Sequence, residues 1–323
     1  MELSSETLNK KIPHLLNSAI ERRSLLFENS ETDCFRIFNA AGDGIDGLTA
    51  DFYSGYILLQ YFNNSAKEII NKILPDLIKV IPVPVKAVLC KNRMTPARDE
   101  VPDELWKSGI LEGNCPSDGI VVMQNGIKAR VDLVNGQNTG IFLDMREIRD
   151  KLAFFYKTES VKRMLNLFSY TALFSVHALK NGAGNAVNID LSRGVLNRAK
   201  VNYQLNDLRI DERDFIYGDA LEWTKQLSKK NISFDYAVFD PPTFARNKKK
   251  NFSVKKDYSD SLQKVELVVN DGFILTSVNS YTVTEQEYRS YHPAAWELLM
   301  FSNESSDFVN SGNPYLKVGL WKI

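Results

Sequence analysis

"RMLNLFSYTALFSVHALKNGAGNAVNIDLS", residues Arg163 to Ser192, decides how the second half of the chain is interpreted. It begins with an apolar run typical of a buried strand, continues with helical periodicity, and ends in a second apolar run. Strand, helix and strand in this order indicate a parallel pair joined by a crossover helix. The alternation continues, with further strands predicted over 214–220, 234–242, 272–280 and 315–323. Residues 136–323 are therefore predicted to form a doubly wound, mostly parallel α/β sheet.

The first 135 residues show a different pattern. Apolar residues three and four apart predict an amphipathic helix over 15–27. Short apolar runs separated by Gly-Asp and Ser-Gly turns then predict strands. Between "IVVMQ" and "IKARV", the pair Asn125-Gly126 predicts a two-residue type I′ hairpin. Residues 1–135 are thus expected to form a smaller α+β domain that precedes the sheet.

Composition sets broad limits on the function. A chain of 323 residues with 44% hydrophobic and 25% charged residues fits a globular protein of two or more domains. Because Lys+Arg and Asp+Glu balance at 40 each, any basic surface must be local. Three scattered cysteines, Cys34, Cys90 and Cys115, suggest neither a disulfide framework nor a metal site. With no membrane-length apolar stretch and no signal peptide, we expect a cytoplasmic protein without a membrane partner.

Carboxylates follow three successive predicted strands. In an open α/β sheet, ligands bind beyond the carboxyl ends of the strands, near the point where the strand order reverses. Asp190 is placed there to accept hydrogen bonds from both hydroxyls of a ribose, and Asp219 to accept one from an adenine amino group. Each could instead cap a helix or lie in a solvated turn. The shared position on successive strands, which includes Asp240, favours a nucleoside site.

The loop after the first of these strands separates two cofactor classes. A nicotinamide dinucleotide requires G-x-G-x-x-G there, so that the backbone can approach the pyrophosphate. This chain has "FSYTALFS", which contains no glycine. S-adenosylmethionine (SAM) carries a ribose and an adenine but no phosphate, and it tolerates a bulkier loop. The loop sequence therefore favours SAM over a nicotinamide dinucleotide as the cofactor.

"VFDPPTFARNKKK", Val238 to Lys250, is the second distinctive segment. Two prolines can simply end a strand. In a site, Asp240 and the carbonyls beside Pro241 would bond the edge of a flipped base, Pro242 would help to hold them still, and Phe244 would stack on the base. The basic residues that follow offer phosphate contacts, unless they form only a solvated loop: Arg246, Lys248, Lys249, Lys250, Lys255 and Lys256.

Five segments in order resemble the motifs of bacterial SAM-dependent methyltransferases that modify 23S ribosomal RNA bases. They are "GQNTGIFLDMREIRDKL" (Gly136 to Leu152), "LNLFSYTALFSVHALKNGA", "NIDLSRGVLNRAKVNYQLNDL", "GDALEW" and "FDPPTFARNKK". The resemblance continues upstream through "GDGIDGLTADFY" to about Ile20. The relatives make 5-methylcytosine or, in the case of "DPPTF", 7-methylguanine. The resemblance implies a Rossmann-like fold, SAM as cofactor and RNA, in particular ribosomal RNA, as partner.

The resemblance also implies site residues. Arg146 would hold the methionine carboxylate of the cofactor, because a guanidinium binds a carboxylate in a bidentate manner. Asp240, Pro241, Pro242, Phe244 and Asn279 would face the transferred methyl group and the base. The full set implied for the cofactor is Asn138, Thr139, Gly140, Asp144, Arg146, Asn166, Phe168, Tyr170, Thr171, Asp190, Leu191, Asp219, Ala220 and Asp240.

The sequence departs from these relatives in three places. Ala172 and Leu173 stand where relatives have glycine, and the N-terminal PUA domain of the 5-methylcytosine enzymes is not seen. Those enzymes also need a cysteine after the fifth strand, since carbon 5 of a pyrimidine becomes nucleophilic only after a thiolate adds to carbon 6. Here Asn279 occupies that place, as in the 7-methylguanine relatives, and every cysteine precedes residue 116. We therefore predict direct transfer to a nitrogen.

Two other functions stay open at the level of sequence. A non-catalytic, RNA-binding descendant of the fold is suggested by Ala172-Leu173 and by the missing domain. A small-molecule methyltransferase is suggested by the zero net charge.

Overall fold

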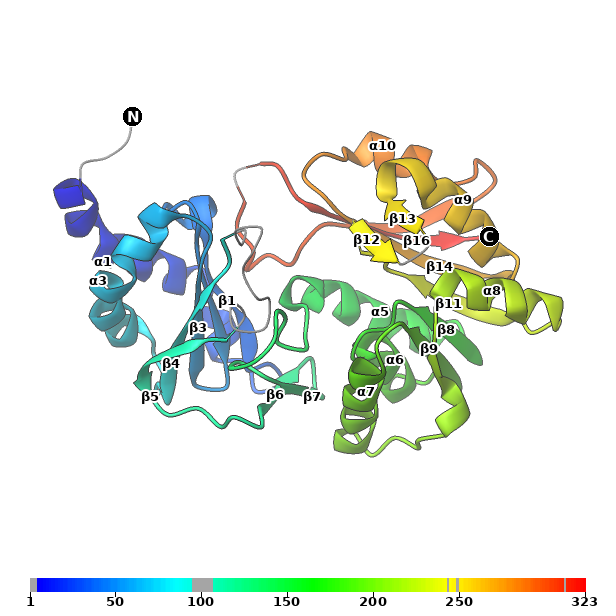
Figure 1. Ribbon diagram of the computed structural model, residues 1–323, viewed down its shortest axis with the longest axis horizontal. Coiled ribbons are helices and arrows are strands. Elements are labelled where there is room, and N and C mark those ends of the chain that lie inside the picture. Colours follow the sequence, from blue (N-terminus) through cyan, green and yellow to red (C-terminus); the bar gives the residue numbers. More distant parts are fainter. Residues whose placement is uncertain (1–4, 95–106, 243, 248–249, 311) are drawn as a thin grey trace. The chain divides into compact units, whose positions relative to one another are not determined.

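The structure, a computed structural model, describes residues 5–94, 107–242, 244–247, 250–310 and 312–323, with the backbone alone for residues 5–10, 244–247 and 250–256. The chain divides into two compact units (Figure 1). Unit 1 comprises Met1–Arg146 and Ser305–Gly312, and unit 2 comprises Glu147–Glu304 and Asn313–Ile323. Residues 305–312 thus belong to unit 1, although both flanking segments belong to unit 2. The domain boundary expected after residue 135 stays a prediction.

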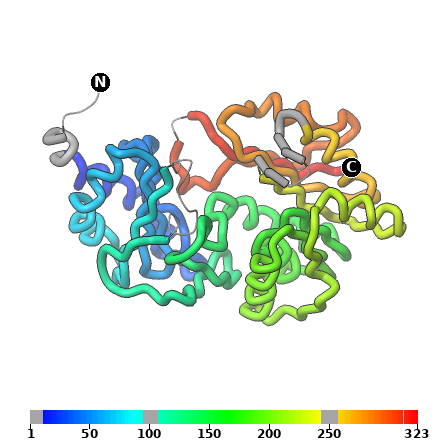
Figure 2. The backbone as a smooth tube through the Cα atoms, viewed as in Figure 1, coloured from blue at the N-terminus to red at the C-terminus, as the bar shows by residue number. Residues whose placement is uncertain are grey.

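Unit 1 is built on a five-stranded sheet, whose course runs from blue to green in Figure 2. Its strands lie in chain order: β1 (Cys34–Asn39), β2 (Leu48–Tyr53), β3 (Tyr56–Tyr61), β4 (Ala87–Asn92) and β5 (Gly109–Gly113). Neighbours are antiparallel except β3 and β4, which are parallel because helix α3 (Asn64–Val80) crosses between them. One face of the sheet, including Phe35, Ile37 and Leu59, packs its apolar side chains with those of α3 and α1 (Ser5–Glu21).

Two local predictions in unit 1 have different outcomes. The hairpin is confirmed, because β6 (Ile120–Gln124) and β7 (Ile127–Val131) pair across Asn125 and Gly126, whose φ angles are 52° and 73°. The single helix over 15–27 is wrong. Helix α1 ends at Glu21 and a short α2 (Ser24–Phe27) follows, since Arg23 leaves the helical conformation and its buried guanidinium donates to Asp43 and to the carbonyl of Asp307.

Unit 2 is a seven-stranded sheet in the order β10-β9-β8-β11-β14-β16-β15. The five parallel strands are β8 (Arg163–Leu167), β9 (Asn185–Asp190), β10 (Phe215–Tyr217), β11 (Phe234–Phe239) and β14 (Val269–Asn279), and β16 (Leu316–Lys322) and β15 (Glu297–Ser302) are antiparallel at one edge. From β8 the chain proceeds to β9 and β10, whereas from β11 it proceeds in the opposite direction. The reversal between β8 and β11 is the topological switch point of a doubly wound sheet, so the predicted fold class is confirmed.

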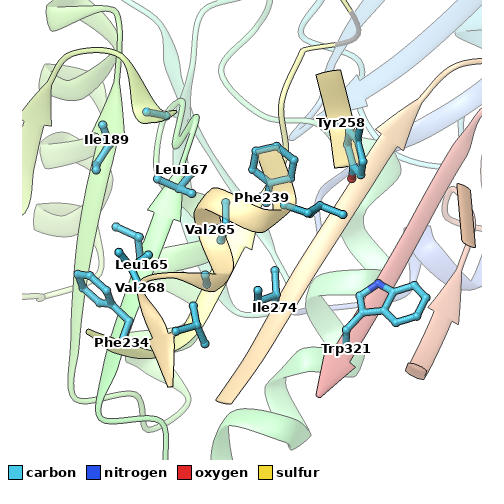
Figure 3. Close-up of a cluster of buried hydrophobic side chains, with 14 of the residues drawn as sticks. Leu165, Leu167, Ile189, Phe234, Phe239, Tyr258, Val265, Val268, Ile274 and Trp321 are labelled. Atoms are coloured by element: carbon cyan, nitrogen blue, oxygen red, sulfur yellow. The ribbon is translucent and has the colours of Figure 1, made fainter. Parts of the chain in front are cut away.

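Helices cover both faces of this sheet (Figure 1). Helices α6 (Leu173–Lys180) and α7 (Arg193–Leu205) lie on one side, and α8 (Ala220–Lys229) and α9 (Val254–Glu266) on the other. Helix α5 (Arg146–Thr158) precedes the sheet and α10 (Glu285–Ser290) follows β14. The α8 and α9 side buries the main apolar cluster, in which Leu167, Phe239 and Val265 pack together (Figure 3). Because side chains along a strand point alternately to the two faces of a sheet, the strand residues that alternate with this cluster face α6 and α7.

Two elements of unit 2 differ from the sequence predictions. Strand β15 was not predicted. The basic stretch expected to be a loop has an antiparallel hairpin as its backbone, with β12 (Phe244–Asn247) paired to β13 (Lys250–Ser253). Aromatic residues favour strands, and Phe244 and Phe252 lie in this pair. Lys255 and Lys256 belong to the first turn of α9.

Candidate cofactor and substrate site

The parallel strands of unit 2 bring their carboxyl ends to one edge of the sheet. Phe168 follows β8, Asp190 ends β9, Asp219 lies two residues after β10, Asp240 follows β11 and Asn279 ends β14. All five were predicted site residues. This shared edge at the switch point is where ligands of doubly wound sheets bind.

The loop from Phe168 to Ala172 has an unusual backbone. Phe168, Tyr170 and Ala172 have φ angles of 57°, 49° and 59°, which cost an L-residue roughly 1–2 kcal/mol each. Surrounding groups hold this conformation. The Ser169 N–H donates to the Ile189 carbonyl at 3.0 Å, and the Asn202 side chain donates to the Thr171 carbonyl at 2.9 Å. Ala172 therefore adopts the left-handed conformation that glycine favours.

Asp190 ties this loop to the second strand. One carboxylate oxygen accepts the Tyr170 N–H at 3.0 Å and the other accepts the Ser192 N–H at 2.9 Å. Partial burial raises the pKa of Asp190, and these backbone N–H groups oppose that rise. Since each carboxylate oxygen has two lone pairs, both can still accept a hydroxyl. The next residue, Leu191, is 49% exposed and offers an apolar surface beside the carboxylate.

Asn166 lies in a buried polar chain beneath the strand ends. Its amide donates to Ser175 Oγ of α6 at 2.9 Å, Ser175 Oγ donates to Asn188 Oδ1 of β9 at 2.7 Å, and Asn188 donates to the Tyr203 hydroxyl of α7 at 2.9 Å. These contacts join two strands and two helices on one face of the sheet. Asn166 is thus held within this chain, and its expected contact with the cofactor stays a prediction.

Asp219 caps a helix. Its Oδ1 accepts the Leu221 and Glu222 N–H groups at 3.0 and 3.1 Å at the start of α8, so the helix-capping alternative is what the contacts show. Ala220 is buried directly behind it. A capping residue still presents its carboxylate at the sheet edge, and the predicted adenine contact stays untested.

Asp240 contacts the neighbouring strand β14. Its carboxylate accepts the hydroxyl of buried Ser277, and the Tyr258 hydroxyl of α9 donates to the Ser277 carbonyl at 2.7 Å. Burial raises the pKa of Tyr258 well above its ordinary value, so this tyrosine stays a neutral donor. Pro241 is buried and Pro242 is exposed, while Asn279 is exposed two residues beyond Ser277. Asp240 is therefore held at a defined place on the edge.

The remaining predicted cofactor residues belong to unit 1. Asn138 is exposed, Gly140 has a φ of 116°, and the Thr139 hydroxyl lies 3.3 Å from the Tyr53 hydroxyl. This loop is held by cations, because buried Lys91 donates to the Gly136 carbonyl at 2.9 Å and Arg93 to the Gln137 carbonyl at 2.6 Å.

Asp144 and Arg146 lie next to the segment 305–312. The Asp144 carbonyl accepts from the Ser305 N–H and hydroxyl, and Arg146 donates to the Asp307 carboxylate at 2.9 Å. The guanidinium of Arg146 thus forms a buried ion pair within unit 1. Its expected role toward the methionine carboxylate stays a prediction.

Some predicted residues fall outside this description. Lys248 and Lys249 lie outside the described residues, and only the backbone is described for Phe244, Arg246 and Lys250. Over the described ranges, no group of three or more His, Cys, Asp or Glu side chains gathers as around a metal ion. No described helix is long and apolar enough to cross a lipid bilayer.

Sequence reasoning missed three residues that support the site. Ser277 contacts Asp240, Asn202 holds the Thr171 carbonyl, and Asp307 pairs with Arg146. The position of Ser277 near the end of a predicted strand was the only available signal. The other two contacts depend on packing between distant parts of the sequence.

The class of protein follows from this geometry. A doubly wound sheet with a glycine-free first loop and a carboxylate ending the second strand is a Rossmann-like fold suited to a nucleoside cofactor that lacks a pyrophosphate. The sequence profile described as "S-adenosylmethionine-dependent methyltransferase" matches residues 35–290, so the chain belongs to this family. Its cofactor is SAM, and the edge offers the Asp190 carboxylate as an acceptor for hydroxyl donors and exposed Leu191 as an apolar surface.

Two curated relatives extend the comparison. The chain is 33% identical over 283 residues to the Bacillus subtilis (strain 168) protein named "Putative ribosomal RNA large subunit methyltransferase YwbD", covering 87% of this chain and 70% of that protein. It is 33% identical over 265 residues to "Ribosomal RNA large subunit methyltransferase I" of Aeromonas salmonicida, covering 81% of this chain and 64% of that protein. The chain thus spans about two thirds of the length of these relatives.

Solved structures agree in fold. One, described as "Crystal structure of SMU.776, a putative methyltransferase complexed with SAH", aligns with a TM-score of 0.88 and 27% identity, covering 98% of this chain and 82% of the other. Another, "A putative sam-dependent methyltransferase from Streptococcus mutans", aligns with a TM-score of 0.86 and 25% identity over 100% and 82% of the two chains.

Proposed function

We propose that this protein methylates a base of ribosomal RNA at a nitrogen atom, by direct transfer from SAM. Two observations support the substrate class: the names of the relatives that match four fifths or more of this chain, and the "DPPTF" segment at the end of β11. A ribosomal substrate would place the protein in the cytoplasm.

The proposal that the methylated atom is a nitrogen depends mainly on the positions of the cysteines. All three cysteines precede residue 116, and Asn279 ends the strand where a nucleophilic cysteine is expected in 5-methylcytosine enzymes. A nucleophilic thiol needs a lowered pKa, but burial raises the pKa of Cys90 to about 11 and also raises that of Cys115. A guanine N7 already has a free lone pair and needs only correct placement.

The chain's own residues would then act by binding and orientation. SAM supplies an electrophilic methyl group on its sulfonium. Asp190 would accept the ribose hydroxyls, the strained loop would pass beside the methionine end, and Asp219 with Ala220 would border the adenine. Asp240, held by Ser277, would orient the base, Phe244 would stack on it, and Arg246, Lys248, Lys249 and Lys250 would contact phosphates.

Residues of unit 1 complete the proposal. Asn138, Thr139, Gly140, Asp144 and Arg146 would contribute to cofactor binding, and residues 1–135 would contribute to RNA binding. These roles rest on the sequence resemblance alone.

Nucleoside analysis of ribosomal RNA tests the proposal. Total 23S RNA from wild-type and deletion cells is digested and compared by mass spectrometry, then re-examined after complementation with the wild-type gene and with Asp240→Ala. We expect one methylated nucleoside, modified at a nitrogen, to disappear on deletion and to return with the wild-type gene only. Identical nucleoside profiles in all strains would exclude ribosomal RNA as the substrate, and loss of a carbon-methylated pyrimidine would exclude the nitrogen.

A further inference from the structure

A pair of tyrosines lies at the carboxyl edge of unit 2, beyond the residues assigned above. Tyr281 follows the end of β14 and Tyr315 precedes the start of β16. Because Asn279 and Leu316 pair at the ends of these antiparallel strands, both tyrosines come to the same edge as Asp240. Their ring centroids are 5.4 Å apart at an interplanar angle of 54°, and Tyr281 is 64% exposed.

The backbone beneath the two rings is cross-linked. The Ser280 N–H donates to the Tyr315 carbonyl at 2.7 Å, so the two tyrosine-bearing segments are joined directly. Lys317 is 3% exposed, and its ammonium donates to the Ser280 carbonyl at 2.8 Å and to the Pro314 carbonyl at 2.7 Å. A buried cation therefore fixes the residue before each tyrosine.

These backbone hydrogen bonds distinguish Tyr281 from an aromatic residue that is exposed by chance. Burying a lysine is costly, and burial lowers the pKa of Lys317 accordingly. The two carbonyl contacts offset part of that cost and fix the backbone that carries the two rings. Rigid exposed aromatic rings are the groups on which unpaired nucleic acid bases stack.

Position indicates which base would be bound. Strands rise about 3.3 Å per residue, so Asn279 lies about 7 Å beyond Ser277, the partner of Asp240, and Tyr281 follows two residues later in the turn after the strand. That distance suits a nucleotide next to the target rather than the target itself. We propose that Tyr281, supported by Tyr315, is the stacking platform for an unpaired base that flanks the methylated nucleotide. This inference rests on the proposed function.

The experiment uses the full-length protein and a 12-nucleotide single-stranded RNA of mixed sequence that carries one 2-aminopurine. Binding is followed by titration, and stacking by quenching of the 2-aminopurine fluorescence. Tyr281→Ala should weaken RNA binding about 5- to 150-fold and abolish the quenching, because one base loses its aromatic partner. Tyr281→Phe should keep both within about twofold, since the ring is retained.

Three controls make the result specific. Phe154→Ala removes another exposed aromatic ring of unit 2, 74% exposed on α5, and should leave RNA binding unchanged. SAM affinity and the melting temperature of Tyr281→Ala should match those of the wild type. Equal binding by Tyr281→Ala and wild type overturns the inference while leaving the proposed function intact, and equal loss in Tyr281→Phe and Tyr281→Ala overturns stacking in favour of a hydroxyl contact. Absence of RNA binding by the wild type counts against both proposals.

Discussion

At the scale of single residues, Asp190 combines a structural role with the proposed role in cofactor binding. Its carboxylate already accepts two backbone N–H groups, from Tyr170 and Ser192, and thereby joins the first two strand ends. The same carboxylate is the proposed acceptor for the ribose. Loop conformation and cofactor binding therefore depend on one side chain.

We expect Asp190→Ala to weaken SAM binding by about 100-fold or more, because hydrogen bonds to a charged acceptor contribute about 1.5–3 kcal/mol each and two are lost. Calorimetric titration measures the change. Asp235→Asn is the matched control, since Asp235 also accepts two backbone N–H groups, from Lys162 and Arg163 at the opposite edge of the sheet, and should leave SAM affinity unchanged. Equal losses in the two variants would indicate general destabilisation instead of a binding role.

The pH dependence of binding follows from the same residue. Burial raises the pKa of Asp190 above its ordinary value of 3.8, so this carboxyl takes up a proton at a higher pH than an exposed one. Hydroxyl donors favour the ionised form. SAM affinity should therefore fall as the pH drops from neutral toward the ordinary range of an aspartate, and it should fall less steeply in Asp190→Asn. A pH-independent affinity in the wild type, in protein that circular dichroism shows to be folded, would contradict this expectation.

Ala172 offers a test of backbone strain. Its φ of 59° is left-handed and its side chain is buried. Ala172→Gly should leave the free energy of unfolding within about 1 kcal/mol of the wild type or raise it, since relief of strain is offset by the greater freedom of glycine in the unfolded chain. Ala172→Val should lower it by about 2–3 kcal/mol, because a β-branched residue is poorly tolerated there. Urea denaturation distinguishes them, and a valine variant as stable as the wild type would show that the loop can relax.

At the scale of elements, the basic segment that includes β12 and β13 carries the proposed phosphate contacts. Changing Lys248, Lys249 and Lys250 together to alanine should weaken RNA binding about uniformly across sequences and reduce the salt slope by up to about 2, at about 0.7 per lost phosphate contact on a single strand. The matched control changes three exposed lysines on and just after α8, namely Lys225, Lys229 and Lys230. SAM affinity should stay constant in both triple variants. Unaltered salt dependence in the variant of residues 248–250 would make the basic segment a solvated surface only.

Elements also show how much of the fold could be predicted. Strands β9, β10 and β11 have apolar runs ending near polar residues, so their ends were placed within a few residues, and Asp190, Asp219 and Asp240 followed from those ends. Strand β15 was missed although Pro293 and a turn at Ala294 and Ala295 precede it. The contacts of Ser277 with Asp240 and of Asp307 with Arg146 join residues 37 and 161 positions apart, and no local pattern predicts such pairs.

At the scale of the whole molecule, the location of the cysteines distinguishes direct transfer to nitrogen from transfer through a covalent thiolate adduct. The triple variant Cys34→Ser, Cys90→Ser, Cys115→Ser should retain its turnover if transfer goes directly to nitrogen, apart from the folding cost of burying hydroxyls. RNA containing 5-fluorocytidine should give no trapped complex, whereas an enzyme that adds a thiolate to carbon 6 would stall on it. Gel analysis under denaturing conditions reads out the adduct. A stable adduct, or complete loss of activity in a folded triple variant, would return the chain to the 5-methylcytosine branch.

The return of residues 305–312 to unit 1 has a consequence for biosynthesis. Asp307 pairs with Arg146, and its carbonyl receives the guanidinium of Arg23, yet residues 147 to 312 are a further 166 residues of synthesis. At 5–20 residues per second, a ribosome needs about 8–33 s to make them. Unit 1 is therefore completed only after residues 147–312 have been made, and a nascent chain that stops before residue 307 lacks the carboxylate with which buried Arg146 pairs.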